Sequence, residues 1–165
     1  MRSLYLANVT VHVLASFLWL GGMFFFAVVG APVLRHVQPA ELRARLFEQL
    51  GYRFRTAGWV AIGILLVTGV LNLHFVGLLR WERLADPVLW DSPYGRALAW
   101  KLGAVAIMVT VSAIHDFVHG PRASRLAPGS PQALRARKRA SWLARVNAVV
   151  GLVLVIAAGR LARGG

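Results

Sequence analysis

Uncharged apolar runs alternate with short basic segments along the whole chain. Four runs are long enough to cross a bilayer, since a span takes roughly 20 apolar residues at about 1.5 Å each. They cover about residues 4–34, 56–79, 97–119 and 141–159. The pattern predicts an all-α fold, namely an integral membrane four-helix transmembrane bundle. It also predicts a single four-span membrane domain over residues 1–165, surrounded by the lipid bilayer.

The three connections between these runs differ in character. Residues 35–55 carry five arginines, and leucines recur at helical spacing after Pro39, which predicts a short interfacial helix. Residues 80–96 hold tryptophan and tyrosine side chains typical of the aromatic belt at a membrane surface. Residues 120–140 are rich in Pro, Gly, Ser and Arg, which predicts a polar loop.

Charge adds an orientation to this picture. The chain has 19 Lys and Arg against 6 Asp and Glu, a net charge of +13. The basic residues lie mostly between apolar runs, as topology determinants do, so we expect no nucleic-acid partner. The first and third connections hold five and six of them, and Arg145 makes twelve, against seven elsewhere. The positive-inside rule then predicts that both termini lie on the non-cytoplasmic side.

The chain has few sulfur-containing side chains. The chain has no cysteine, which excludes disulfides, thiolate metal sites and cysteine nucleophiles. Cu(I) favours thiolate and thioether ligands, but only Met23 and Met108 lie inside the predicted spans. A methionine-lined copper pathway is therefore hard to build from one chain, and a histidine site for haem iron or Cu(II) is easier.

Ionisable residues inside a span indicate function, because a charge deep in a bilayer is costly unless it is paired. Counting from the span centres places His12, His74 and Lys101 about 10 Å outward of the middle. Two histidines at matched depth on neighbouring helices could ligate haem b in a slot lined by Trp19, with Lys101 near a propionate. The alternative is that each histidine only bonds neighbouring helices together.

A second polar layer is expected in the inner half of the bundle. His115 and His119 are four residues apart on one helix face, so together they could form a second metal site. Asp116 and Arg145 lie at a similar depth. His115 and His119 are also close to the cytoplasmic interface, where a solvated polar role is the alternative. His36 follows the first span and is expected at the interface.

Two segments resemble the copper-resistance protein D (CopD) family. Residues 12–24 contain a histidine followed by Trp-Leu-Gly-Gly, and residues 92–102 contain Tyr-Gly-Arg followed by a lysine; Thr68-Gly69 also fits that family's pattern. The resemblance implies copper handling at a bacterial-type inner (plasma) membrane as a multi-pass protein. It also implies a periplasmic copper protein as a partner. Full-length CopD proteins have about eight spans, which implies a homodimer or a place in a larger membrane complex here.

The first segment is also similar to the HemJ family of four-helix protoporphyrinogen oxidases. In that family the histidine of the first helix, matched here by His12, is tied to haem b. His36 stands near the place of a second histidine of that family, and Lys101 fits its Lys-Leu pair.

Three functional hypotheses follow. The leading one is a CopD-like membrane protein with haem b at His12 and His74, acting in electron transfer or redox chemistry linked to copper; as an enzyme it would be a membrane oxidoreductase. The second is copper transport or delivery across the inner membrane. The third is a structural subunit of a respiratory membrane complex.

Overall fold

The computed structural model describes residues 2–119 and 130–164, apart from the side chains at 133, 134 and 137. The described chain is helical throughout, and strands are absent from these ranges. Four of its helices are long and apolar enough to cross a membrane, which confirms the predicted fold class. They comprise Arg2–Arg35, Ala40–Phe75, Pro93–His119 and Lys138–Leu161. The helices group into two compact units, residues 1–84 and 85–165, and each is described separately. That the chain forms one domain stays a prediction, as does the side on which its termini lie.

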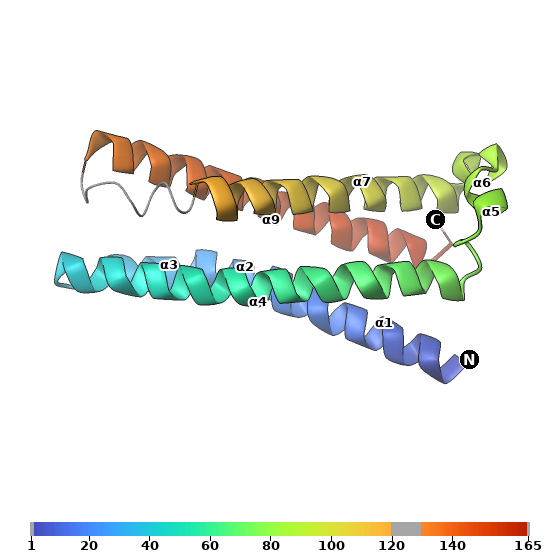
Figure 1. The fold of residues 1–165 in the computed structure, drawn as a ribbon, viewed down its shortest axis with the longest axis horizontal. Helices are drawn as coiled ribbons and strands as arrows, with labels where there is room; N and C mark the ends of the chain where they lie inside the picture. Colours follow the sequence, from blue (N-terminus) through green and yellow to red (C-terminus); the bar gives the residue numbers. More distant parts are fainter. Residues whose placement is uncertain (1, 120–129, 165) are drawn as a thin grey trace. The chain divides into compact units, whose positions relative to one another are not determined.

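The first unit is an antiparallel helix pair (Figure 1). Its first rod runs through α1 (Arg2–Ser16), η1 (Phe17–Gly21), α2 (Gly22–Phe25), η2 (Phe26–Gly30) and α3 (Ala31–Arg35). The elements η1 and η2 are single turns of π-helix within this rod. Such turns widen the helix locally and often occur at functional sites. The rod ends at Arg35, and α4 (Ala40–Phe75) begins directly after Pro39.

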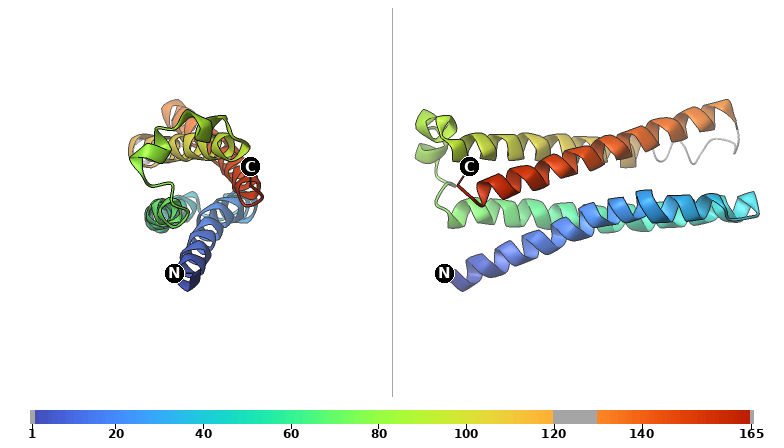
Figure 2. Two further views of the ribbon diagram at one scale, coloured as in Figure 1. Left: turned by 90° about the vertical axis from the view of Figure 1, so that its right-hand side faces the viewer. Right: turned by 180° about the vertical axis from the view of Figure 1, so that it is seen from behind.

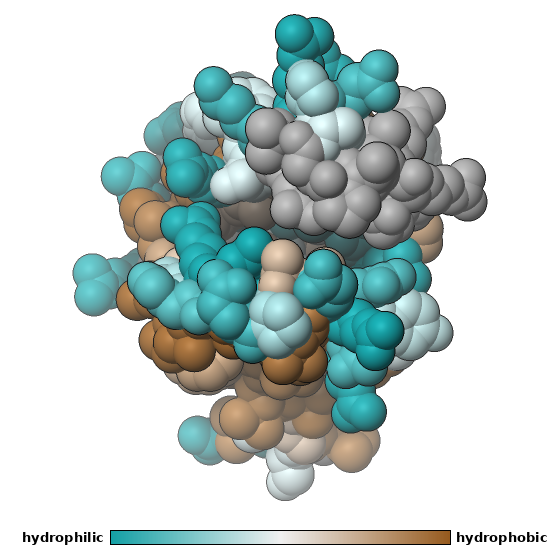
Figure 3. Space-filling model, turned by 90° about the vertical axis from the view of Figure 1, so that its left-hand side faces the viewer, coloured by the Kyte–Doolittle hydropathy of each residue, from teal (hydrophilic) through white to brown (hydrophobic). Residues whose placement is uncertain are grey.

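Helix α4 is longer than the second predicted span. The short interfacial helix expected within residues 35–55 does not form separately: it is the first part of α4. No proline interrupts residues 40–75, so the helix continues into the membrane span. Hydrophilic side chains gather at the end where α3 meets α4, with apolar side chains behind them (Figure 3). This part of α4 therefore carries the basic surface of the first unit.

Helix α4 stops in a defined motif. Gly77 has φ +73°, a left-handed conformation that glycine adopts without strain. Its N–H donates to the carbonyl of His74 (3.0 Å), and the N–H of Leu78 donates to that of Leu73 (2.9 Å). These bonds form a Schellman motif and satisfy carbonyls that a helix end leaves without partners. The short helix α5 (Trp81–Leu84) then follows.

The second unit contains α6 (Pro87–Asp91), α7 (Pro93–Ala113), η3 (Ile114–His119) and α9 (Pro131–Leu161). Helices α7 and α9 run antiparallel and pack along their lengths (Figure 2). Small or slender side chains follow one stripe of α7 and are buried, and such residues let neighbouring helices approach closely. They are Ala97, Ala104, Met108 and Ser112.

The start of α9 corrects the third predicted connection. Residues 120–129 of the expected polar loop lie outside the described residues, but residues 131–140 are helical rather than looped. Pro131 suits the first helical position because its fixed φ matches the helix and its missing N–H needs no partner there. The Ala, Arg and Lys residues that follow are strong helix formers.

Candidate functional site

The contact between α1 and α4 is built around four polar side chains in an apolar surrounding. This polar cluster consists of Asn8, His12, Thr68 and Asn72. Asn8 Nδ2 donates to the backbone carbonyl of Thr68 and to Asn72 Oδ1, both at 2.9 Å. Asn8 and Thr68 are buried, and His12 and Asn72 are half-buried. The cluster therefore ties the two helices together at a defined register.

His12 is anchored by a short bond to the opposite helix. Its Nδ1 lies 2.7 Å from Thr68 Oγ1. The single hydroxyl proton of Thr68 is directed at the carbonyl of Ile64, 2.6 Å away in the same helix. Thr68 Oγ1 therefore accepts, and His12 Nδ1–H donates. The lone pair of the neutral imidazole then resides on Nε2, the atom that would bind a metal.

This arrangement is the usual support for a metal-binding histidine. A ligating imidazole donates its other N–H to a nearby oxygen, which fixes the tautomer and the ring orientation. Gly69 lies beside the ring, since a Cβ built on it would be in ordinary van der Waals contact with His12 Cε1, at 3.7 Å. Position 69 thus brings helix backbone close to the imidazole.

His74 is placed differently from His12. Its side chain is exposed, and its ring makes an edge contact with Phe75, with centroids 6.0 Å apart. Along the antiparallel pair, His12 is level with Thr68, whereas Phe75 beside His74 makes an edge contact with Tyr5 at a centroid distance of 5.8 Å. Six residues separate His74 from Thr68, an axial offset of about 9 Å. Their shared ligation of one metal stays a prediction.

Trp19 lies further along the same helix contact. It is buried, with 6% of its surface exposed, and belongs to η1. A Cβ built on Gly58 of α4 would lie 3.9 Å from Trp19 Cδ1, so the indole packs over that glycine.

Lys101 belongs to α7 of the second unit and is half-buried. The grouping of Lys101 with His12 and His74 stays a prediction.

The second predicted metal site falls in η3. His115 and His119 are both half-buried in this turn of π-helix. His115 Nδ1 lies 2.8 Å from Asp116 Oδ1, so the imidazole is oriented by its neighbour in sequence. Arg145 is exposed on α9. Among the described residues, no group of three or more His, Cys, Asp or Glu side chains is arranged to hold a metal ion. The two-histidine site stays a prediction.

His36, which follows the first span, is exposed. Its Nδ1 lies 3.0 Å from the carbonyl of Pro32.

The partners of His12 are what sequence reasoning missed. Thr68 was noted from the sequence only for its family pattern. Asn72 was not singled out at all, although an amide inside an apolar span is itself a signal. In the second unit, Asn147 Nδ2 donates to Ser112 Oγ at 2.8 Å, and both side chains are buried. Each unit thus holds its helix pair with an amide.

The comparisons with known proteins decide the family. The sequence profile described as "Copper resistance protein D" (CopD) matches residues 48–161. The chain belongs to the CopD family. The match covers Thr68, Asn72 and His74 but begins after His12. An uncharacterized protein of Aquifex aeolicus (strain VF5) is 27% identical over 154 residues, covering 93% of this chain and 92% of that protein.

No solved structure matches the chain significantly. Membership of the CopD family agrees with the resemblance seen in residues 92–102, which lie inside the matched region. It also agrees with the four helices able to cross a membrane. The resemblance to the HemJ family stays a prediction.

Gly95 of the CopD-like segment has a physical explanation. It sits in the first turn of α7, where Ser92 Oγ accepts the N–H of Gly95 at 3.0 Å and Pro93 occupies the first helical position. A Cβ on Gly95 would collide with the carbonyl of Leu89. The close turn from α6 into α7 therefore requires glycine at this position.

Proposed function

We propose that this CopD protein binds copper within the α1–α4 pair and passes it across a bacterial-type inner membrane, with His12 as its principal ligand. One observation carries the proposal: the bond between His12 Nδ1 and Thr68 Oγ1, at 2.7 Å. It holds the imidazole in one orientation inside the contact between two helices that are long and apolar enough to span a membrane.

Copper fits this donor. Imidazole nitrogen binds Cu(II) well, and a nitrogen ligand also binds Cu(I), although less favourably than sulfur. The anchored imidazole of His12 supplies only one copper ligand. A transport site must bind its ion weakly enough to release it, so few ligands suit transport. The further ligands would come from a second copy of the chain or from a periplasmic copper protein that delivers the ion. A homodimer or a larger membrane complex is therefore part of the proposal.

A resident haem b fits the helix pair less well. Bis-histidine ligation puts two imidazoles on opposite sides of one iron, whereas His12 and His74 are offset by about 9 Å along the pair. The structure also places the His74 side chain at an exposed position. We therefore derive no redox step through haem, and we treat electron transfer as the alternative that the same experiment addresses.

The experiment is copper analysis of the purified full-length chain in detergent, beside copper accumulation in cells. We expect His12→Ala to lose at least about tenfold in copper affinity, because it removes the anchored ligand. His36→Ala is the matched control, since His36 is exposed and bonds only within its own turn among the contacts described. It should bind copper as the natural protein does.

Three results would overturn the proposal. Equal copper binding by His12→Ala and His36→Ala would show that His12 is not a copper ligand. A Soret band in the absorption spectrum that disappears in His12→Ala and His74→Ala would support haem instead. Unchanged copper accumulation in His12→Ala cells that still assemble a membrane complex would favour the structural-subunit hypothesis.

A further inference from the structure

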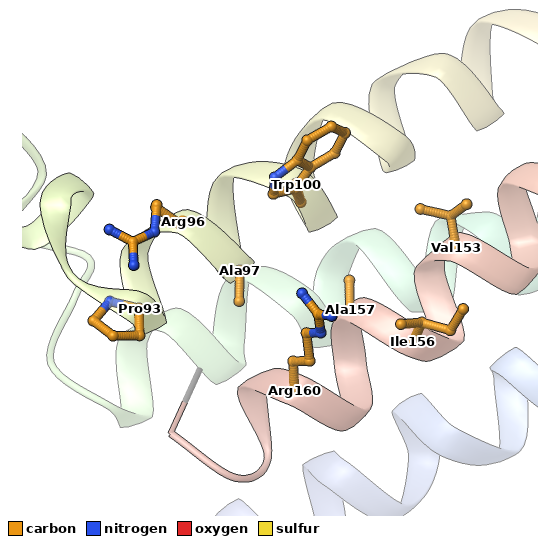
Figure 4. Close-up of a pocket in the computed structure, with 8 residues that line it drawn as sticks. All are labelled: Pro93, Arg96, Ala97, Trp100, Val153, Ile156, Ala157 and Arg160. Carbon is orange, nitrogen blue, oxygen red and sulfur yellow. The ribbon is translucent and has the colours of Figure 1, made fainter.

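A groove between α7 and α9 combines an apolar wall with two arginines. It has a volume of about 360 Å³, and every residue lining it belongs to the second unit (Figure 4). Ala97 and Ala157 are buried at its floor. The lining residues are Pro93, Arg96, Ala97, Trp100, Val153, Ile156, Ala157 and Arg160. None of these eight is acidic, so the groove is positively charged.

The arginines occupy one end of the groove. Arg96 stands in the first turns of α7, and its Nη1 donates to the carbonyl of Asp91 at 2.6 Å. That bond uses one of five N–H groups of the guanidinium. Arg160 comes from the last turn of α9, and its side chain points toward α7 (Figure 4). Each guanidinium group can contact an oxyanion such as phosphate with parallel N–H bonds. In Figure 4 the Arg96 group is turned toward the side of Pro93 and away from Arg160, and both side chains are exposed, so a phosphate shared by the two requires Arg96 to change rotamer.

The other end of the groove is apolar and open to the surroundings. Trp100 is 72% exposed, Ile156 61% and Val153 39%. All three lie within helices that can span the membrane, one to two turns from the arginines. Such a surface is in contact with lipid chains rather than water. The groove thus presents charge at its end near the membrane surface and apolar surface toward the membrane interior.

We propose that this groove binds one anionic phospholipid, with its phosphate between Arg96 and Arg160 and an acyl chain along Trp100, Val153 and Ile156. Charge complementarity selects this occupant. A zwitterionic lipid brings a cationic group close to two arginines, which weakens its binding. An apolar helix from a second copy would cover the wall but leave the two like charges facing apolar surface, which is unfavourable.

The test measures lipid binding to the full-length chain by native mass spectrometry in detergent. Phosphatidylglycerol and phosphatidylcholine with identical acyl chains are added in turn, and inorganic phosphate is added alone. We expect one tightly retained phosphatidylglycerol per chain, at least about tenfold preferred over phosphatidylcholine. The double variant Arg96→Ala/Arg160→Ala should lose this preference.

The matched control is Arg80→Ala/Arg163→Ala, which removes the same charge at two exposed positions outside the groove. It should retain the lipid as the natural protein does. Arg160→Ala alone provides a second variant if loss of the Arg96 bond to Asp91 impairs folding. Trp100→Ala should weaken both lipids to a similar degree, because it removes only chain contacts.

Equal retention of phosphatidylglycerol by the two double variants would overturn the proposal, and so would equal binding of the two lipids by the natural protein. If the chain retains inorganic phosphate as well as it retains phosphatidylglycerol, the arginines bind a free anion rather than a lipid. A dimer that persists in the absence of lipid and requires Trp100 would show that a second copy occupies the groove. None of these outcomes depends on copper binding at His12.

Discussion

Replacing Thr68 by valine tests the link between the helix register and the chemistry of His12. The change puts a methyl group where the hydroxyl stands and nearly preserves the volume, so it isolates the hydrogen bond. Thr68 is buried, with 6% of its surface exposed, and its Oγ1 is 2.7 Å from His12 Nδ1. The variant therefore removes the acceptor that fixes the imidazole tautomer.

Two magnitudes follow from this geometry, and they differ. Interhelical side-chain bonds in membranes contribute about 0.6 kcal/mol on average and up to about 1.7 kcal/mol, so the loss of stability is modest. The loss of a bond that orients a metal-binding histidine lowers metal affinity by roughly 10–100-fold, equal to about 1.4–2.8 kcal/mol. We therefore expect Thr68→Val to weaken copper binding more than it weakens folding.

Three measurements check this expectation. Unfolding in a denaturing detergent gives the stability, and competition with a chromophoric chelator gives the copper affinity. Nitrogen-15 NMR of histidine reports which ring nitrogen of His12 carries the proton. Thr68→Ser keeps the hydroxyl and should restore both the affinity and the tautomer. Thr110→Val is the matched control, because Thr110 Oγ1 makes the same kind of bond within its helix, to the carbonyl of Ala106 at 2.8 Å, at an exposed position.

Either of two results would refute the reasoning. One is a His12 ring in the natural protein that carries a proton on Nε2 and none on Nδ1, which would reverse the direction of the Thr68 bond. The other is a Thr68→Ser variant that binds copper as weakly as Thr68→Val, which would show that the hydroxyl is not what supports the site.

Two further predictions concern the helix contacts. A double-mutant cycle of Asn8→Ala and Asn72→Ala should give a coupling free energy of about 0.6–1.7 kcal/mol in detergent unfolding, and a coupling of zero would contradict the register. Gly95→Ala should destabilise the chain by about 1–3 kcal/mol or more, because the new Cβ meets the Leu89 carbonyl, whereas Gly103→Ala, with nothing within 4 Å, should be neutral or slightly stabilising. A folded, fully stable Gly95→Ala protein would contradict this.

The number and type of the helices could be predicted from sequence because a bilayer imposes a length on every apolar run. The ends were harder. The second run was placed at 56–79, but α4 covers residues 40–75. The leucines of its first part predict a helix there, but not that this helix continues without a break into the span. Its end is determined by Gly77, whose left-handed φ is a local turn property. Apolar periodicity reports burial in lipid, not the hydrogen bonds that begin and end a helix.

The site was predictable only in part, for a related reason. Counting from the centres of apolar runs assigns a depth to His12 and His74, but an error of a few residues in each run moves the assigned levels by several ångströms. The actual register depends on contacts between residues about 60 positions apart, such as Asn8 with Asn72. Such pairings are not visible in a single sequence. The individual polar residues were visible, and their partners were not.

A comparison of the two helix pairs supports the proposed role of His12 as a ligand. In the second unit, one amide bond from Asn147 to Ser112 joins buried positions of α7 and α9. In the first unit, Asn8 already provides two interhelical bonds of this kind. The register of α1 on α4 is thus fixed by amides, as it is in the other pair. The imidazole at that contact adds a basic nitrogen that no amide has. The ligand chemistry of that nitrogen is therefore the best physical reason for a histidine at position 12.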